Sequence, residues 1–109
     1  RTLRPEVPII MVEGPMYPYA KFDKYFANYL PKKNAAFYKN YLRLKEENQD
    51  NIYYVTCEGL YGDHEGTVDG IHATDIGFLA YAKKLEPVIM QALVQSKLVA
   101  KPENGKVKK

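Results

Sequence analysis

The sequence lacks both the cysteines of a disulfide scaffold and the long apolar run of a membrane span. It contains one cysteine, Cys57, so no intrachain disulfide framework forms, which is compatible with the cytosol and equally with a secreted protein that uses none. No apolar run approaches the roughly 20 residues of a transmembrane helix, so no membrane span is predicted. Serine is equally scarce: Ser96 is the single one, which limits the hydroxyl nucleophiles available for covalent catalysis.

The N-terminal residues 1–5 have neither an initiator methionine nor an apolar signal core. This start is typical of a cut inside a longer chain, and it does not indicate a compartment. The length of 109 residues predicts at most one domain with one modest core.

The net charge of +3 comes from the C-terminal tail. Residues 101–109 hold four lysines against one glutamate, whereas residues 1–100 carry twelve cations and twelve anions. Such a basic tail is typical of a solvated, disordered end. We therefore expect the domain to occupy residues 1–100, and we expect no nucleic-acid partner, because its charge is balanced.

Apolar patterning predicts alternating strands and helices. The expected elements are a strand at 7–12, a loop at 16–29 with a helical turn near 23–30, a helix at 33–48, a strand at 52–57, a glycine-punctuated loop at 58–68 and a helix at 74–98. The first strand is an uninterrupted apolar run, which favours an inner strand of a parallel sheet. This order predicts a right-handed crossover unit of an α/β sheet, with ligands beyond the carboxyl ends of its strands.

Both predicted helices have an apolar face. In the first, the face is formed by Phe37, Tyr41 and Leu44. In the second, Thr74 is the expected N-cap, Asp75 suits the helix dipole, and Pro87 is expected to kink the helix without ending it. The stripe expected on that helix consists of Phe78, Ala82, Leu85, Ile89 and Leu93.

Two strands and two helices do not complete a doubly wound domain. A two-stranded sheet leaves edges and faces that need partners. We expect these partners to come from the remainder of the domain outside this chain, from a second copy of the chain, or from a separate polypeptide.

The most informative motif is the stretch at 69–72, which places Asp69 three residues before His72 and ahead of the last helix. A carboxylate beside an imidazole fixes its tautomer and stabilises the imidazolium that forms when it takes a proton from a hydroxyl. The nucleophile is missing, because Ser96 lies deep in the last helix and Cys57 is typical of a small buried apolar residue. The alternative is a local turn capped by the carboxylate.

Other groups have both functional and structural interpretations. Glu13, at the end of the first strand, either faces a cleft or is a solvated strand end. A zinc or manganese site is the less favoured interpretation of an acidic loop, with the candidate ligands Asp63, His64, Glu65, Asp69, His72 and Asp75. Aromatic residues either line an acyl or sugar pocket or pack against the sheet, the second being favoured; they are Tyr17, Tyr19, Phe22, Tyr25 and Phe26.

Three segments carry a family resemblance. Residues 67–78, continued by Ala82 and by Leu85-Glu86-Pro87-Val88, resemble the last conserved block of the SGNH, or GDSL-like, hydrolases. Residues 7–13 and 51–55 resemble the final two sheet strands of bacterial members described as lipases or acylhydrolases. The resemblance implies the C-terminal βαβα portion of a three-layer α/β/α, flavodoxin-like domain.

The resemblance also implies a function. His72 matches the family's general base and Asp69 its orienting carboxylate, whereas the nucleophilic serine and the oxyanion hole are expected before Arg1. The implied activity is serine ester hydrolysis, with a small-molecule ester, such as an acylated carbohydrate, as substrate and with no cofactor or metal. Relatives of this type suggest a secreted or periplasmic protein. The alternative is a non-catalytic, self-associating α/β interaction module.

Overall fold

The computed structural model describes residues 2–47, 49–62 and 64–98. Its elements, in chain order, are strand β1 (Ile9–Val12), the 3₁₀ helix η1 (Pro18–Lys21), helix α1 (Lys24–Glu46), strand β2 (Ile52–Val55), the 3₁₀ helix η2 (His64–Gly66) and helix α2 (Asp75–Gln95). The predicted tail at 101–109 and Asp63 lie outside the described residues. No helix of the described residues is long and apolar enough to cross a membrane.

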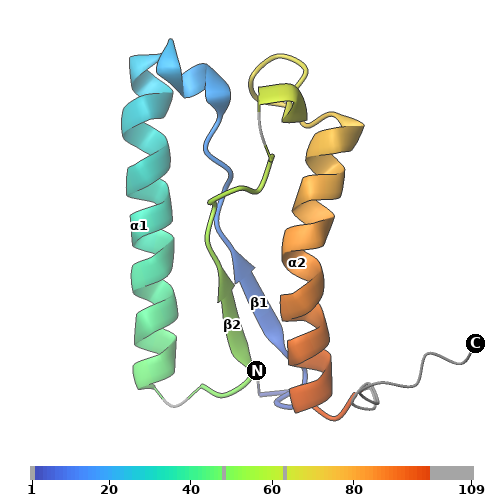
Figure 1. The fold of residues 1–109 in the computed structure, drawn as a ribbon. Helices are drawn as coiled ribbons and strands as arrows, with labels where there is room; N and C mark the ends of the chain where they lie inside the picture. The colour runs from blue at the N-terminus through green and yellow to red at the C-terminus, as the bar shows by residue number, and fades with distance from the viewer. Residues whose placement is uncertain (1, 48, 63, 99–109) are drawn as a thin grey trace, which may run out of the picture.

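The two strands are parallel and lie between the helices. Ile9 pairs with Ile52 at one end of the ladder, and Val12 pairs with Val55 at the other. Figure 1 shows α1 and α2 on either side of the strand pair, with η1 and η2 together at the end where the strands point. This arrangement confirms the predicted partial α/β fold and places both post-strand loops at one edge.

The expected inner position of β1 stays a prediction, because its further neighbour was expected from outside the described residues. Within the described residues the sheet has two strands, so β1 has a hydrogen-bonded neighbour on one side and an open edge on the other. Ile9 is 41% exposed, because no element of this region covers it fully.

Helix α1 is one continuous element, although a separate helical turn and a later helix were expected. Asp23 caps it by accepting hydrogen bonds from the N–H groups of Tyr25 and Phe26, at 2.8 and 3.2 Å. Pro31 removes one backbone donor without breaking the helix, because Leu30 and Asn34 are buried on either side of it.

The predicted apolar face of α1 is confirmed by its aromatic contacts with β2. The ring centroids of Phe37 and Tyr41 lie 5.9 and 4.9 Å from that of Tyr54, and Tyr38 meets the same ring edge-on at 5.1 Å. Aromatic pairs of this kind contribute ~0.5–1.5 kcal/mol beyond their buried area. They hold α1 against the sheet.

Helix α2 begins after the predicted N-cap Thr74 and continues through Pro87, but its buried face differs from the expected stripe. Phe78 is 64% and Ile89 40% exposed, whereas Gly77 and Ala92 are buried. The reason is the close approach at Gly77, where a Cβ would lie 2.0 Å from the carbonyl oxygen of Gly66. The buried face of α2 is therefore displaced from the predicted stripe by one residue, which is a rotation of about 100° around the helix axis.

Candidate active site

The loop that bears Asp69 and His72 is a tight reversal between η2 and α2. Thr67 and Ala73 form an isolated antiparallel bridge, and the N–H of Val68 donates to the carbonyl of His72 at 2.9 Å. At the tip, Gly70 has φ +82°, a conformation that a side chain would strain. These contacts fix the path of the loop.

The same loop is docked on the segment that follows β1. The N–H of Tyr19 donates to the carbonyl of Gly70 at 3.1 Å, and a Cβ on Gly70 would lie 3.0 Å from the Cβ of Tyr19. Glycine at this position therefore permits a close contact between two segments that are far apart in the sequence.

Asp69 and His72 are in direct contact. His72 Nδ1 lies 2.6 Å from Asp69 Oδ2, and Asp69 Oδ1 accepts hydrogen bonds from the N–H groups of Ile71 and His72 at 2.9 and 2.8 Å. One carboxylate oxygen thus caps the local turn while the other holds the imidazole, so the two interpretations of the motif describe one geometry.

The contacts of Asp69 determine its charge. The backbone N–H of His72, the His72 side chain and the N–H of Ile71 all stabilise the carboxylate, so the pKa of Asp69 lies far below its usual range. Asp69 is therefore ionised at neutral pH. The His72 side chain is 77% exposed, and within the described residues its Nε2 has no hydrogen-bond partner, which leaves that nitrogen available to a reacting group.

Glu13 joins the ends of the two strands. It is half-buried, and it accepts hydrogen bonds from the Tyr54 hydroxyl at 2.6 Å and from the N–H of Cys57 at 2.7 Å. Burial acts to raise the pKa of Glu13, but these hydrogen bonds outweigh it and hold the pKa below its ordinary value. The interpretation as a solvated strand end is wrong, because this carboxylate ties the ends of the two strands together. Glu13 also lines a second hollow, of about 340 Å³.

A hollow of about 600 Å³ opens at the carboxyl ends of both strands. Its walls come from the segments that follow β1 and β2 and from Ala27 of α1; the lining is formed by residues 15–18, 20–21 and 57–62 together with Ala27. Tyr61 lies in this lining, and burial raises its pKa together with the electrostatic effects of Tyr17, Tyr81 and Asp69. Tyr19, whose neighbours Pro18 and Ala20 line the hollow, donates to the carbonyl of Gly70, so one wall of the hollow adjoins the loop that carries the Asp69–His72 pair.

Some of the aromatic residues singled out in the sequence lie at the hollow, and others are exposed to solvent. Tyr17 lines the hollow, and its ring centroid lies 5.5 Å from that of Phe26, with Tyr19 meeting the same ring at 6.2 Å. Phe22 is 85% and Tyr25 66% exposed, so the expected packing against the sheet is wrong for these two.

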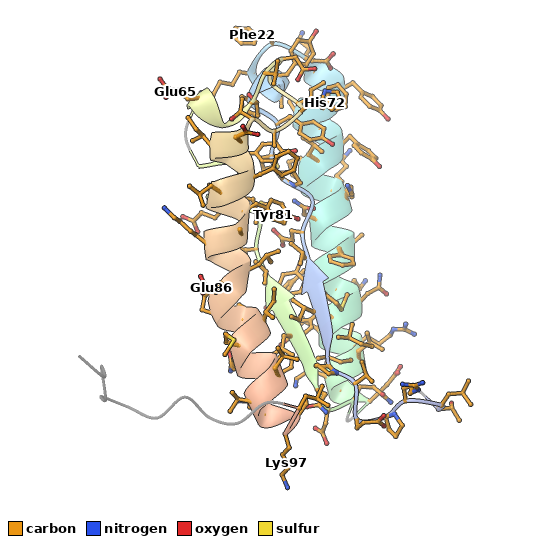
Figure 2. The ribbon with its side chains drawn as sticks, turned by 90° about the vertical axis from the view of Figure 1, so that its right-hand side faces the viewer. Phe22, Glu65, His72, Tyr81, Glu86 and Lys97 are labelled. Carbon is orange, nitrogen blue, oxygen red and sulfur yellow. The ribbon has the colours of Figure 1, made fainter. Side chains whose placement is uncertain are left out.

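Neither Ser96 nor Cys57 fits the place of the nucleophile. Ser96 is the C-cap of α2, about 31 Å along a 21-residue helix from the site, and Figure 2 shows the adjacent Lys97 and His72 at opposite ends of the molecule. Burial, followed by the hydrogen bond and charge of Glu13, raises the pKa of Cys57, which disfavours the reactive thiolate.

Metal ligands do not converge in the part of the chain that the structure describes. Residues 2–47, 49–62 and 64–98 contain no group of three or more His, Cys, Asp or Glu side chains able to hold an ion. Of the candidate ligands, Asp63 lies outside the described residues.

Comparisons with known proteins decide the family. The family model described as "GDSL-like Lipase/Acylhydrolase family" matches residues 1–90. The chain belongs to this family. A crystal structure of a candidate GDSL-like lipase from Bacteroides ovatus superposes with a TM-score of 0.76 at 33% identity over 84% of the chain. No curated protein matches.

Membership of the GDSL-like family confirms the resemblance and the partial α/β fold. The chain spans 28% of the length of the Bacteroides ovatus structure that it matches.

Sequence reasoning missed two contacts, namely the hydrogen bonds by which Glu13 joins the two strand ends and the docking of Tyr19 on Gly70. A carboxylate directly after a strand was the available signal for the first, whereas nothing in the pattern indicated the second.

Proposed function

We propose that His72 is the general base of a GDSL-like ester hydrolase and that Asp69 orients it. The observation that carries this proposal is the 2.6 Å contact between His72 Nδ1 and Asp69 Oδ2 in an exposed side chain whose Nε2 has no hydrogen-bond partner among the described residues. The carboxylate holds the proton on Nδ1, so Nε2 carries the lone pair that accepts a proton from a nucleophile.

In the proposed mechanism, His72 takes the proton of an attacking serine hydroxyl and later delivers it to the alcohol that leaves. Asp69 stabilises the imidazolium between these steps and keeps its own negative charge, as its strongly lowered pKa requires. The same imidazole then activates the water that hydrolyses the acyl-enzyme.

The serine and the oxyanion donors of this mechanism are proposed to come from another part of the protein. The open edge of β1 is where a further parallel strand would pair, and the matching relative is a longer chain. On this proposal, residues 1–100 form the C-terminal portion of the domain. The substrate is a small ester, with acylated carbohydrate as one class.

The test is the His72→Ala variant of the protein that carries these residues together with its serine. Loss of a general base is expected to lower kcat for p-nitrophenyl acetate about 10²–10⁴-fold, with partial recovery on adding imidazole. Lys97→Ala, at the opposite end of the molecule, is the control and should keep its activity. Unchanged hydrolysis by His72→Ala would disprove the proposal.

A self-associating module is the second candidate, and it is favoured by the exposed apolar residues of α2. Ile76 and Leu79 are each 55% exposed and Phe78 is 64% exposed. This candidate predicts a stable, monodisperse assembly of the 109-residue chain in light scattering. A monomer with molten-globule behaviour would count against it.

A further inference from the structure

The loop that carries the proposed base fixes its own shape, and a contact from outside holds its tip. The N–H of Val68 donates to the carbonyl of His72, and Asp69 accepts from the N–H of His72. These bonds fix the imidazole relative to the loop, but not relative to the strands. The hydrogen bond from the N–H of Tyr19 in η1 to the carbonyl of Gly70, at 3.1 Å, joins the tip to another part of the molecule. The place of the imidazole relative to the sheet therefore depends on η1.

The contact between Gly70 and η1 is close enough to set the position of the loop. A Cβ on Gly70 would lie 3.0 Å from the Cβ of Tyr19 and 3.1 Å from its backbone nitrogen. The two segments therefore leave no room for a side chain between them. A methyl group on Gly70 would push the tip away from η1 and would move the preceding residue, Asp69, with it.

The 3₁₀ helix η1 is in turn anchored on α1. The half-buried ring of Phe26 meets the rings of Tyr17 and Tyr19 edge-on, with centroid distances of 5.5 and 6.2 Å. Figure 2 shows Phe22, which follows η1, at the same end of the molecule as His72. The contacts thus form one line from α1 through η1 to the loop that carries the imidazole.

We propose that Gly70, Tyr19 and Phe26 are positioning residues, which hold His72 where its Nε2 reaches the attacking hydroxyl. The inference rests on the proposed role of His72 as general base. A misplacement of ~1 Å costs up to about 10²-fold in rate, so a small shift of the loop tip has a large kinetic effect. The contact between Asp69 and His72 lies within the loop, so such a shift changes the place of the base and leaves the pair intact.

The first test is Gly70→Ala in the catalytically competent protein, assayed with p-nitrophenyl acetate. We expect kcat to fall about 10–100-fold, KM to stay within about twofold, and the pH profile of kcat/KM to keep its shape. In a His72→Ala background, the same substitution should change the rate by less than about twofold, because no base is left to position. General damage to the fold would give losses of equal size in the two backgrounds, and that result would overturn the proposal.

Hydrogen exchange of the Tyr19 amide reads the contact directly. Gly59→Ala is the control for backbone strain, because Gly59 also has a positive φ, +69°, but nothing lies within 4 Å of an added Cβ. Exchange at Tyr19 should be faster than in the parent for Gly70→Ala and unchanged for Gly59→Ala. An unchanged rate in Gly70→Ala would mean that η1 does not hold the loop, which would also overturn the proposal.

Phe26→Leu is the second variant, should Gly70→Ala fail to fold, and Phe22→Leu is its control. Both remove a phenyl ring near the start of α1, but Phe22 is 85% exposed, whereas Phe26 contacts Tyr19. We expect kcat to fall at least about threefold in Phe26→Leu and to stay within about twofold of the parent in Phe22→Leu. Equal activity of the two variants would contradict the anchoring of η1.

The two proposals fail in different ways. Hydrolysis that survives His72→Ala would refute the proposed base. Hydrolysis that is lost in His72→Ala but unchanged in Gly70→Ala would leave the base in place and refute the positioning role.

Discussion

Asn34 holds the chain at the exit of β1, and replacing it by alanine is expected to destabilise the fold substantially. Its side chain accepts a hydrogen bond from the N–H of Gly14 at 3.1 Å and donates one to the carbonyl of the same residue at 2.8 Å. Asn34 is 6% exposed, so water does not replace both partners easily once the amide is removed.

The magnitude follows from these two bonds. Removing the amide leaves two partners on half-buried Gly14 unpaired, and each costs toward the lower end of ~1–3 kcal/mol, so the two together cost ~2.5 kcal/mol. The higher helix propensity of alanine offsets up to ~0.7 kcal/mol. We therefore expect Asn34→Ala to lower the free energy of unfolding by about 2 kcal/mol, which is a large share of the ~5–15 kcal/mol typical of a domain.

The assay is urea unfolding followed by circular dichroism. With a slope of ~2 kcal/mol/M, the midpoint should fall by about 1 M. The control is Asn40→Ala on the same helix, because Asn40 is exposed and donates only to the carbonyl of Ala36 at 3.1 Å. That variant should stay within about 0.5 kcal/mol of the parent. Equal losses in the two variants would refute the role assigned to Asn34.

Two further predictions concern the close contact at α2 and the tie between the strands. Gly77→Ala should lower the free energy of unfolding by about 1–3 kcal/mol, because the added Cβ would lie 2.0 Å from the carbonyl oxygen of Gly66. In a helix with free space at that position, Gly→Ala usually stabilises by ~1 kcal/mol, and such a gain would contradict the close contact. Glu13 has a lowered pKa, so its contribution to stability is present above its unfolded value near 4.5 and is lost as the pH falls through the folded pKa. Thermal melts of Glu13→Gln should therefore differ most from the parent at pH 7 and converge toward pH 3, and a difference independent of pH would argue against the tie.

Local sequence spacing was sufficient to predict the contact between Asp69 and His72. The two residues are three positions apart in a tight loop, so neighbouring backbone N–H groups and the imidazole converge on one carboxylate. The cap at Thr74 was predictable for the same reason, because its hydroxyl accepts from Gly77 within one turn. Features set by short stretches of backbone were recovered well.

Features set by contacts between distant segments were not recovered. The rotation of α2 depends on how closely Gly77 approaches Gly66, and apolar periodicity alone does not encode that approach. The continuity of α1 through Pro31 depends on burial on either side of the proline. Tertiary packing therefore overrode the local signals at these positions, whereas the order of elements and the parallel pairing followed from the apolar pattern.

The most direct test of the proposed function is the value of kcat/KM for Asp69→Asn relative to Asp75→Asn in the catalytically competent protein. Both changes remove one carboxylate beside the same loop, but only Asp69 contacts the imidazole. The proposal predicts a fall of about 10²–10⁴-fold for Asp69→Asn, because the amide no longer stabilises the imidazolium or its correct tautomer, and little change for Asp75→Asn. Equal activity of the two variants would contradict the role of the Asp69–His72 pair.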